Sequence, residues 1–510
     1  MRLVSERGDF GRFAPVFATI ALALVALFAI ATQAQAAETI YWNNYSGDPD
    51  SIGFASPDGI GGGAVNLGGA VLDGTEGNAY DSVTNRFFVA NDGNDTIVAL
   101  NLDNSGGALF LAPGAPVESP EGLVVDPVSR TVYWINTATE TISWARLDGS
   151  AGGLVGTGGS KVNAYRLSFD PTTNRLYWFD ESAKTIQSVS AAGGSVSSLN
   201  TLGATVGSSA SGIAVEPALG KVFWLNENEK AVSWASLAGT GGGDLPVSES
   251  ALNGPYGLSV DLAAGRIYWA NYSNGESRTD ALGVLLLAGG SAPINVQSAP
   301  VDGPQDPVLL KPPAIVTAPA ITRGTKAARA QLTCPTGTWA GDSPGAFAYR
   351  APRSYGYQWT RGGAPIAGAI GSTLTATAAG SYACTVTATN QAGTAGSTSG
   401  AVVVKASKVK LSTKKKAKAD AGDLVTFKVK AVNQGDLKAK SAKLCVKLPG
   451  SAKDDLKAPK CKKLSLAGQA KKTLTLKVKV KGGADEGTAK LTFQVKGSAG
   501  KAAKSKILVK

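Results

Sequence analysis

The sequence of 510 residues contains no histidine, and this absence excludes several kinds of chemistry at once. Without an imidazole there can be no Ser-His-Asp triad, no Cys-His nucleophile and no His-ligated zinc. Cysteine occurs only four times, with no Cys-x-x-Cys pair, and charged residues make up 17% of the chain. We therefore expect no catalytic residues, no cofactor site and no metal site, and we predict that the protein is not an enzyme.

Long apolar runs are also absent after the first 36 residues, while glycine is abundant, at 63 residues. Hydrophobic residues at 43% and aromatic residues at 7% are enough for packed cores, so the chain is globular rather than disordered. A single core stops growing near ~250–300 residues, which implies two to four domains. The glycine-rich, weakly charged composition favours turn-rich β structure, and we predict an all-β fold.

The N-terminus has the pattern of a secretory signal peptide, which we expect as a helix over residues 1–36. Three arginines precede an apolar run from Ala14 to Thr32, and Ala34-Gln35-Ala36 supplies the small residues of a cleavage site. Cleavage after Ala36 would leave a mature protein without a transmembrane span. The run has 19 residues, close to the ~18 that can cross a bilayer, so an uncleaved anchor is the alternative.

In an exported chain the four cysteines are candidate disulfides. Three connectivities are possible, and the pairing between neighbours in the sequence is Cys334 with Cys384 and Cys445 with Cys461.

The strongest signal is an internal repeat between Thr39 and Pro313. An aromatic residue recurs at intervals of 47, 45, 44, 46 and 45 residues, usually followed by Trp and, three positions after the aromatic, by Asn or Asp. The repeated residues are Tyr41, Trp42, Asn44; Phe88, Asn91; Tyr133, Trp134, Asn136; Tyr177, Trp178, Asp180; Phe223, Trp224, Asn226; Tyr268, Trp269, Asn271. Several short strands per ~45 residues is the period of a propeller blade.

The two ends of the repeat region complement each other. The first copy lacks its first strand, whereas Asp302–Leu310 aligns with the first strand of the last copy, Asn253–Asp261. A strand from the C-terminal end can therefore pair beside the strand around Tyr41 and close the ring without an exposed edge. We predict six blades over residues 37–313.

Four of the six aromatic pairs are Tyr-Trp with Asn or Asp at the third position after Tyr, and this repeat resembles the YWTD propeller of low-density-lipoprotein-receptor proteins. The resemblance implies an extracellular, six-bladed, non-catalytic platform that binds proteins. Departures are Phe88-Val89 in the second copy and Arg166, which stands where other copies have Gly. Residues present in every blade are expected to pack and to satisfy hydrogen bonds, so recognition should fall to residues that are not repeated.

Residues 314–404 contain Cys334, Trp359, Tyr382 and Cys384, an arrangement that resembles an immunoglobulin-like β-sandwich. The resemblance implies that Trp359 packs on the disulfide and that Tyr382 fixes a corner between strands. A stretch rich in Gly, Ala and Pro, residues 340–352, separates the first cysteine from Trp359, and we expect it to be an exposed loop, with a binding loop as the alternative.

Residues 405–510 carry 29 lysines, no arginine and seven acids, a net charge of +22, whereas residues 37–313 carry 12 basic and 28 acidic residues, a net charge of −16. Val425, Phe427 and Val429 alternate with polar residues, which indicates half-buried strands. With Asn433-Gln-Gly435 and Leu448-Pro449-Gly450, the segment resembles a CARDB-like adhesion sandwich. We expect only Lys408–Lys418 to be a flexible charged linker.

The lysines do not favour nucleic acid as a partner, because this segment has no arginine for bidentate contacts and only two aromatics for stacking. They suit a solvated strand face or association with an anionic wall polymer or membrane surface.

The sequence thus predicts a secreted or cell-surface binding and adhesion protein, whose propeller recognises an extracellular protein or glycan and whose sandwiches act as spacer or surface contact. One alternative is a structural envelope component held by lysine electrostatics. The other is a propeller hydrolase or lyase that uses two of the 28 ring acids as a carboxylate pair.

Overall fold

The structure is a computed structural model of the chain, and it describes residues 38–46, 50–248, 251–272, 280–297, 299–325 and 328–510. The predicted signal peptide lies outside the described residues. Strands and short 3-10 turns make up the regular structure, which confirms the all-β fold class. Within the described ranges, no helix is long and apolar enough to cross a membrane.

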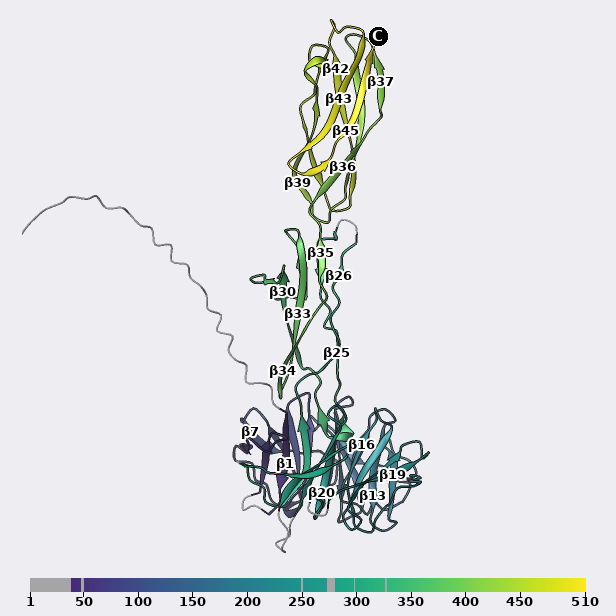
Figure 1. Cartoon of the computed structure of the whole chain (residues 1–510). Helices are drawn as coiled ribbons and strands as arrows, with labels where there is room; N and C mark the ends of the chain where they lie inside the picture. Colours follow the sequence, from purple (N-terminus) through teal and green to yellow (C-terminus); the bar gives the residue numbers. More distant parts are fainter. Residues whose placement is uncertain (1–37, 47–49, 249–250, 273–279, 298, 326–327) are drawn as a thin grey trace, which may run out of the picture. The chain divides into compact units, whose positions relative to one another are not determined.

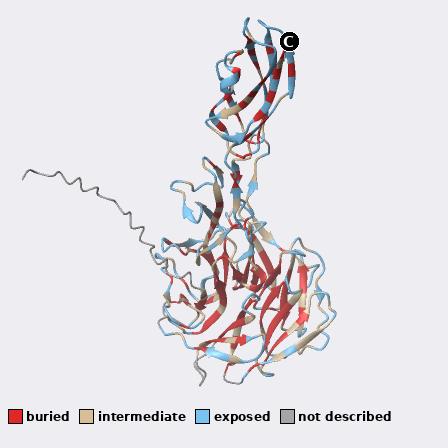
Figure 2. Ribbon diagram, turned by 45° about the horizontal axis from the view of Figure 1, so that its top comes forward, coloured by how far each residue is buried: buried red, intermediate tan, exposed pale blue. Residues whose placement is uncertain are grey.

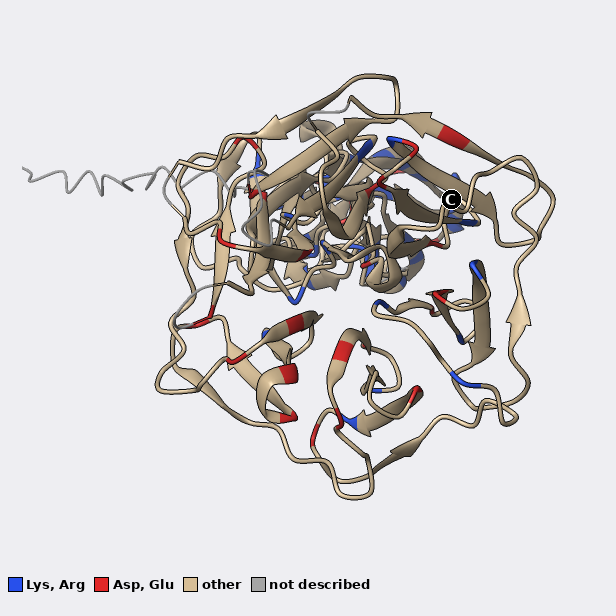
Figure 3. Cartoon of the chain, turned by 90° about the horizontal axis from the view of Figure 1, so that it is seen from below, with Lys and Arg blue, Asp and Glu red and all other residues tan. Residues whose placement is uncertain are grey.

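The repeat region forms a propeller of six antiparallel sheets, seen end-on in Figure 3. Its strands are β1 (Thr39–Asn44), β2 (Ser51–Ala55), β3 (Gly63–Ala64) and β24 (Pro304–Leu310); β4 (Thr75–Asp81), β5 (Arg86–Asn91), β6 (Thr96–Asn101) and β7 (Gly106–Leu109), with the 3-10 turn η1 (Asp92–Asn94); β8 (Pro120–Asp126), β9 (Thr131–Asn136), β10 (Thr141–Arg146) and β11 (Gly152–Leu154); β12 (Ser168–Asp170), β13 (Arg175–Asp180), β14 (Thr185–Ser190) and β15 (Ser197–Ser198); β16 (Ala210–Glu216), β17 (Lys221–Asn226), β18 (Ala231–Ser236) and β19 (Gly242–Pro246); β20 (Pro255–Asp261), β21 (Arg266–Asn271), β22 (Ala281–Leu286) and β23 (Ser291–Ile294).

The innermost strands β4, β8, β12, β16, β20 and β24 contact one another in a closed circle around the channel. We call the side of the ring on which these strands begin the open face, and the side on which they end the closed face.

The ring closes as the sequence predicts. Strand β24 pairs antiparallel with β1, with Leu310 opposite Thr39, Leu309 opposite Ile40 and Val308 opposite Tyr41. The sheet that holds the N-terminal strand therefore takes its innermost strand from the end of the repeat region (Figure 1).

The repeated aromatics and amides hold the scaffold together. The repeated tryptophans are fully buried, and the indole of Trp134 donates a hydrogen bond to Asn136 Oδ1 at 3.0 Å. The same Oδ1 accepts from the backbone N–H of Glu118 at 3.1 Å, and Asn271 accepts from Asn253 in the same way. Each such amide fixes the chain as it approaches an innermost strand, which explains why the residue recurs.

The first sandwich follows the propeller and has its own core. Its strands are β25 (Ile315–Thr317), β26 (Thr322–Arg323), β27 (Gln331–Thr333), β28 (Thr338–Trp339), β29 (Ala348–Tyr349), β30 (Ser354–Arg361), β31 (Ala364–Pro365), β32 (Thr373–Thr375), β33 (Gly380–Asn390), β34 (Gly393–Thr398) and β35 (Val402–Val404), with the 3-10 turn η3 (Pro344–Ala346). Cys334 is bonded to Cys384, and both cysteines share a buried cluster with Trp359. The hydroxyl of Tyr382 donates to the backbone oxygen of Ala378 at 2.7 Å.

The second, lysine-rich sandwich consists of two five-stranded sheets. Its strands are β36 (Lys408–Ser412), β37 (Lys416–Ala419), β38 (Leu424–Asn433), β39 (Ala439–Lys447), β40 (Leu456–Lys457), β41 (Lys462–Leu466), β42 (Lys471–Val480), β43 (Gly487–Lys496), β44 (Ala499–Lys501) and β45 (Ala503–Val509), with the 3-10 turn η4 (Gly450–Ala452). Cys445 is bonded to Cys461. Buried and exposed residues alternate along these strands (Figure 2).

Two expectations about loops are wrong. Residues 408–418 are not a flexible linker, because β36 pairs with β38 and β37 pairs with β45, which buries Val409 and Ala417. Residues 340–352 are not an exposed loop either. The segment contains η3 and β29, and it is packed against the propeller.

Candidate functional site

The channel of the propeller is lined by residues that are not repeated. On the open face, the second residue of each innermost strand and its counterpart before β12 differ from blade to blade: Glu76, Glu121, Tyr165, Ser211, Tyr256 and Gln305. The next position is Gly in four blades, but Arg166 in the fourth blade and Asp306 in the first blade, which β24 completes. The symmetry of the scaffold therefore breaks at the mouth of the channel.

A local kink in the innermost strands explains why glycine is common at this position. Pairing with the neighbouring strand shifts between Ser211 and Ile213 and again between Tyr256 and Leu258, and the intervening Gly212 and Gly257 have φ of +57° and +71°. Such bulges re-aim the adjoining side chains. Asp306 takes a φ of +44° at the same position.

Arg166 departs from this pattern, since its φ is not positive and the following strand β12 keeps three residues instead of seven. The glycines around it leave no spare room. A Cβ atom on Gly122 would lie 2.8 Å from the Arg166 Cα, and one on Gly257 would lie 2.2 Å from Asp306 Oδ1. A side chain on Gly122 or Gly257 would therefore collide with Arg166 or Asp306.

Arg166 bridges four blades. Its Nε lies 2.7 Å from Asp306 Oδ1, an ion pair without straight hydrogen-bond geometry. Its Nη1 donates to Glu121 at 3.1 Å, and its Nη2 lies 3.4 Å from Glu76 and donates to Gln305 at 2.7 Å. The guanidinium carbon also lies 4.2 Å from the ring centre of Tyr256, in a cation–π contact. One cation therefore serves three carboxyl groups.

Burial sets the charge of this cluster. It raises the pKa of Glu121 to about 9 and that of Glu76 to about 7, against the opposing effect of Arg166. Burial also raises the pKa of Asp306, again opposed by Arg166. The raised pKa values favour the neutral forms of Glu76 and Glu121, so the cluster carries less negative charge than its three acids suggest.

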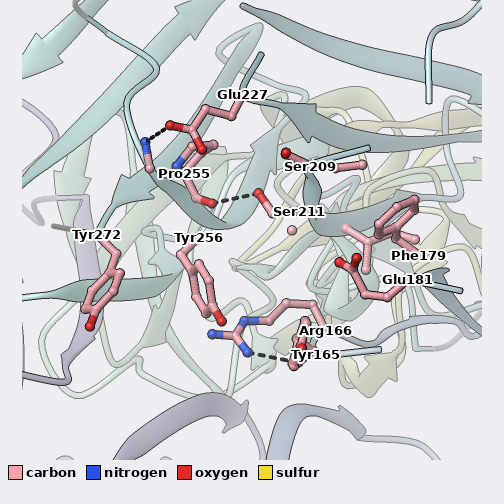
Figure 4. Close-up of a pocket in the computed structure, with 14 residues that line it drawn as sticks. Tyr165, Arg166, Phe179, Glu181, Ser209, Ser211, Glu227, Pro255, Tyr256 and Tyr272 are labelled. Atoms are coloured by element: carbon pink, nitrogen blue, oxygen red, sulfur yellow. Dashed lines mark hydrogen bonds between the residues drawn. The ribbon is translucent and has the colours of Figure 1, made fainter. Parts of the chain in front are cut away.

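A pocket of about 250 Å³ opens beside this cluster, between the blades that begin with β12, β16 and β20. Tyr165 and Arg166 line it from the chain before β12, and Ser209 and Ser211 line it from the residues around the start of β16. Figure 4 shows the aromatic rings of Tyr256 and Tyr272 on one side of the pocket and Phe179 with Glu181 on the other, with Glu227 at a third edge.

Several of these side chains are held in place. Glu227 accepts a hydrogen bond from the backbone N–H of Gly254 at 3.0 Å, and Ser211 donates to the Pro255 oxygen at 2.6 Å. Tyr272 packs against Tyr256, with ring centres 5.9 Å apart, and edge-on against Tyr45 at 5.6 Å. Three tyrosines in contact, Tyr256, Tyr272 and Tyr45, therefore extend from the pocket to the first blade.

The opposite end of the channel is occupied by residues 344–349 of the first sandwich, from η3 to β29, which we call the plug. The Gly345 carbonyl accepts from Ser168 Oγ at 2.8 Å, and a Cβ on Gly345 would lie 2.0 Å from the Phe169 oxygen. Phe347 packs against three separate hydrophobic clusters of the ring. Between Arg166 and Phe347 only about 10 Å³ of space remains, too little for more than one water molecule.

Backbone and ionic contacts fix this plug. Strand β29 lies parallel to β24, and the Phe347 and Tyr349 carbonyls accept from the Leu309 and Lys311 amides, both at 2.8 Å. Arg350 forms an ion pair with Asp261 at 3.3 Å.

The repeated residues predicted from the sequence lie within and between blades, away from the pocket. The sequence does not predict the pocket. One residue points to it, Arg166, which departs from the glycine of other copies. The partners of Arg166, namely Glu76, Glu121 and Asp306, come from other blades, and the sequence alone does not assign them to it. No group of three or more potential metal ligands occurs among the residues that the structure describes.

No protein-family model matches the sequence, and no curated protein matches it. One similar solved structure is a chain of the crystal structure of a nidogen/laminin complex. The similarity covers 53% of this chain and 98% of that chain, with 15% sequence identity and a TM-score of 0.43. From a likeness of this size we infer nothing about function.

Proposed function

We propose that the protein is an exported, non-catalytic binding protein that takes an extracellular protein or glycan ligand in the pocket on the open face of a YWTD-type propeller. The observation that carries this proposal is the contrast between the two ends of the channel. The closed face is occupied by the chain's own Phe347, whereas the open face has a pocket of about 250 Å³.

The lining of the pocket supports a binding role. Tyrosine rings offer large, rigid contact area with few rotatable bonds, and Glu227, Ser209 and Arg166 add polar groups that orient a ligand. Protein side chains and sugars both suit such a surface. The two disulfides fit export to an oxidising compartment.

The raised pKa values of Glu76 and Glu121 do not support the hydrolase alternative. Neither Glu76 nor Glu121 lines the pocket, because Arg166 lies between these acids and the cavity and binds both of them. A general acid has to reach the reacting atom of its substrate.

The proposal is tested by probing protein and glycan arrays with the full chain and two tryptophan variants. Ser209 lines the pocket and is exposed, so Ser209→Trp fills the cavity without disturbing a core. Ser150→Trp adds the same side chain at an exposed turn after β10 and is the matched control. We expect saturable ligands that Ser209→Trp loses and Ser150→Trp retains. No saturable ligand, or equal loss in both variants, would refute the proposal.

A further inference from the structure

The two broad faces of the lysine-rich sandwich carry lysines in unusual positions. On the sheet β37-β45-β43-β39-β41, Lys416, Lys506 and Lys490 lie directly opposite one another on three neighbouring strands. A second row on the same sheet joins Lys463, Lys443 and Lys496. All six side chains are exposed.

Directly opposed like charges destabilise a sheet, and neighbouring strands are only about 4.8 Å apart. Along β43, Lys490 and Lys496 are six residues apart, or about 20 Å, so the two rows cover much of the face. Among the described residues, no lysine between Lys405 and Lys510 forms an ion pair. Within the described part of the chain, no acid neutralises the positive charge of these rows.

The acids of this sandwich are kept away from its faces. Asp420 and Asp423 lie in the turn before β38, Asp454 and Asp455 lie before β40, and Asp485 and Glu486 lie before β43. Backbone bonds from Val480 to Asp423 and from Lys481 to Asp455 bring the first two of these segments to the end of β42, where the third begins. The seventh acid, Asp436, is paired with Arg323 at 3.3 Å and Arg329 at 3.2 Å.

The other sheet is lysine-rich on its outer face as well. Lys428 and Lys430 on β38 and Lys477 and Lys479 on β42 are exposed between buried neighbours. A planar membrane can touch only one face of a sandwich, whereas a flexible chain can reach both. The arrangement therefore favours a polymer over a lipid surface.

We propose that the lysine-rich sandwich binds a linear polyanion, a surface polymer with a phosphate or carboxylate on each repeat, through the lysine rows on its outer faces. Lysine recognises such groups as a point charge and needs no fixed geometry. Nucleic acid is disfavoured, because the only two aromatics of this sandwich, Phe427 and Phe493, are fully buried and cannot stack on bases. This inference does not depend on the ligand of the open face.

The test measures binding of the full chain to long-chain inorganic polyphosphate over a range of salt concentrations. Two variants remove one row each: Lys416→Gln with Lys490→Gln and Lys506→Gln, and Lys443→Gln with Lys463→Gln and Lys496→Gln. The control, Arg146→Gln with Lys161→Gln and Arg361→Gln, removes the same charge from exposed sites outside this sandwich.

We expect affinity to fall steeply with salt, and each row variant to lower the slope of log affinity against log salt by about 2, at about 0.7 per lysine. The control should keep the wild-type slope. Absence of polyphosphate binding at low salt, or unchanged slopes in both row variants, would overturn the proposal. So would tighter binding to phosphatidylglycerol vesicles or to a single-stranded oligonucleotide than to polyphosphate. Cooperative thermal unfolding of the variants, at a midpoint no lower than that of the wild type, excludes misfolding as the cause of any loss.

Discussion

At the scale of single residues, the chemistry of the molecule is concentrated around Arg166. It occupies a position that is Gly in four of the other blades, and it is the cation that holds Glu76, Glu121 and Asp306 in the channel. From this arrangement we expect the stability of the ring to depend on pH. Buried carboxyls with raised pKa values bind protons in the folded state that the unfolded chain has already released.

The free energy of unfolding of the ring should therefore decrease as pH rises from about 5 to about 9, the window between the ordinary pKa of glutamate and the pKa of Glu121 near 9. Glu121→Gln removes one such proton and should flatten this dependence by up to about 1.4 kcal/mol per pH unit. The free energy of unfolding at each pH is measured from tryptophan fluorescence during denaturant unfolding, since most tryptophans lie in the ring. Glu118→Gln, at an exposed site, should keep the wild-type slope, and a slope retained in Glu121→Gln would contradict the assignment.

Replacement of Arg166 by Met should destabilise the ring by about 3–5 kcal/mol at pH 8, because ionised carboxylates are then left buried without a partner. The loss should be smaller at pH 5, where Glu76 and Glu121 are protonated. Chemical unfolding at the two pH values tests both statements. Arg146→Met removes an exposed arginine that makes no ion pair among the described residues, and it should cost little. An equal loss at both pH values would show that Arg166 acts through packing alone.

At the scale of elements, the plug is the feature that joins the first sandwich to the ring. Phe347→Ala removes a ring that packs on three clusters, and we expect a loss of about 3 kcal/mol in ring stability. Faster hydrogen exchange at the Leu309 and Lys311 amides, which bond to the plug, would locate the effect. Tyr355→Ala truncates an exposed aromatic of the same sandwich and is the control. Unchanged exchange in Phe347→Ala would show that the plug does not hold β24.

For the lysine rows we predict the opposite effect of substitution, a gain rather than a loss of stability. Lys506 lies between Lys416 and Lys490, so Lys506→Gln relieves two like-charge contacts and should stabilise the sandwich by about 0.2–1 kcal/mol. Thermal unfolding at low salt should show the gain, and high salt should remove it. Lys460→Gln, in a loop, serves as the comparison. A loss of stability in Lys506→Gln would contradict this prediction. It would mean that packing of the aliphatic part of the Lys506 side chain on the sheet stabilises the sandwich more than repulsion of its charge destabilises it.

The elements also show how far the sequence could lead. The repeat period and the spacing of the aromatics are enough to predict six blades and the closing strand. Both predictions depend on signals that can be read within a single copy of the repeat, namely the alternation of buried positions and the missing first strand of the first copy. Residues 340–352 were misjudged because Gly, Ala and Pro are typical of exposed loops, and nothing local indicates that Gly345 must fit against the Phe169 oxygen. The pocket depends on contacts between distant blades, which no single repeat encodes.

At the scale of the whole molecule, the domains differ in charge, and the two ends of the propeller channel differ in their access to solvent. The propeller region is acidic and the lysine-rich sandwich is basic, and one end of the channel is filled by the chain itself while the other is open. Under the two proposals made above, ligand recognition belongs to the open face and polyanion binding to the lysine rows, so the two activities should be separable by mutation.

The assignment of the open face can be measured by oxidative footprinting of the full chain with a ligand identified on the arrays. Tyr165 is 44% exposed beside the pocket, and Tyr355 is 41% exposed in the first sandwich, so the two side chains report on different surfaces at similar access. We predict that the ligand protects Tyr165 and Tyr272 from oxidation and leaves Tyr355 unchanged. Protection of Tyr355 with no change at Tyr165 or Tyr272 would contradict a binding site on the open face.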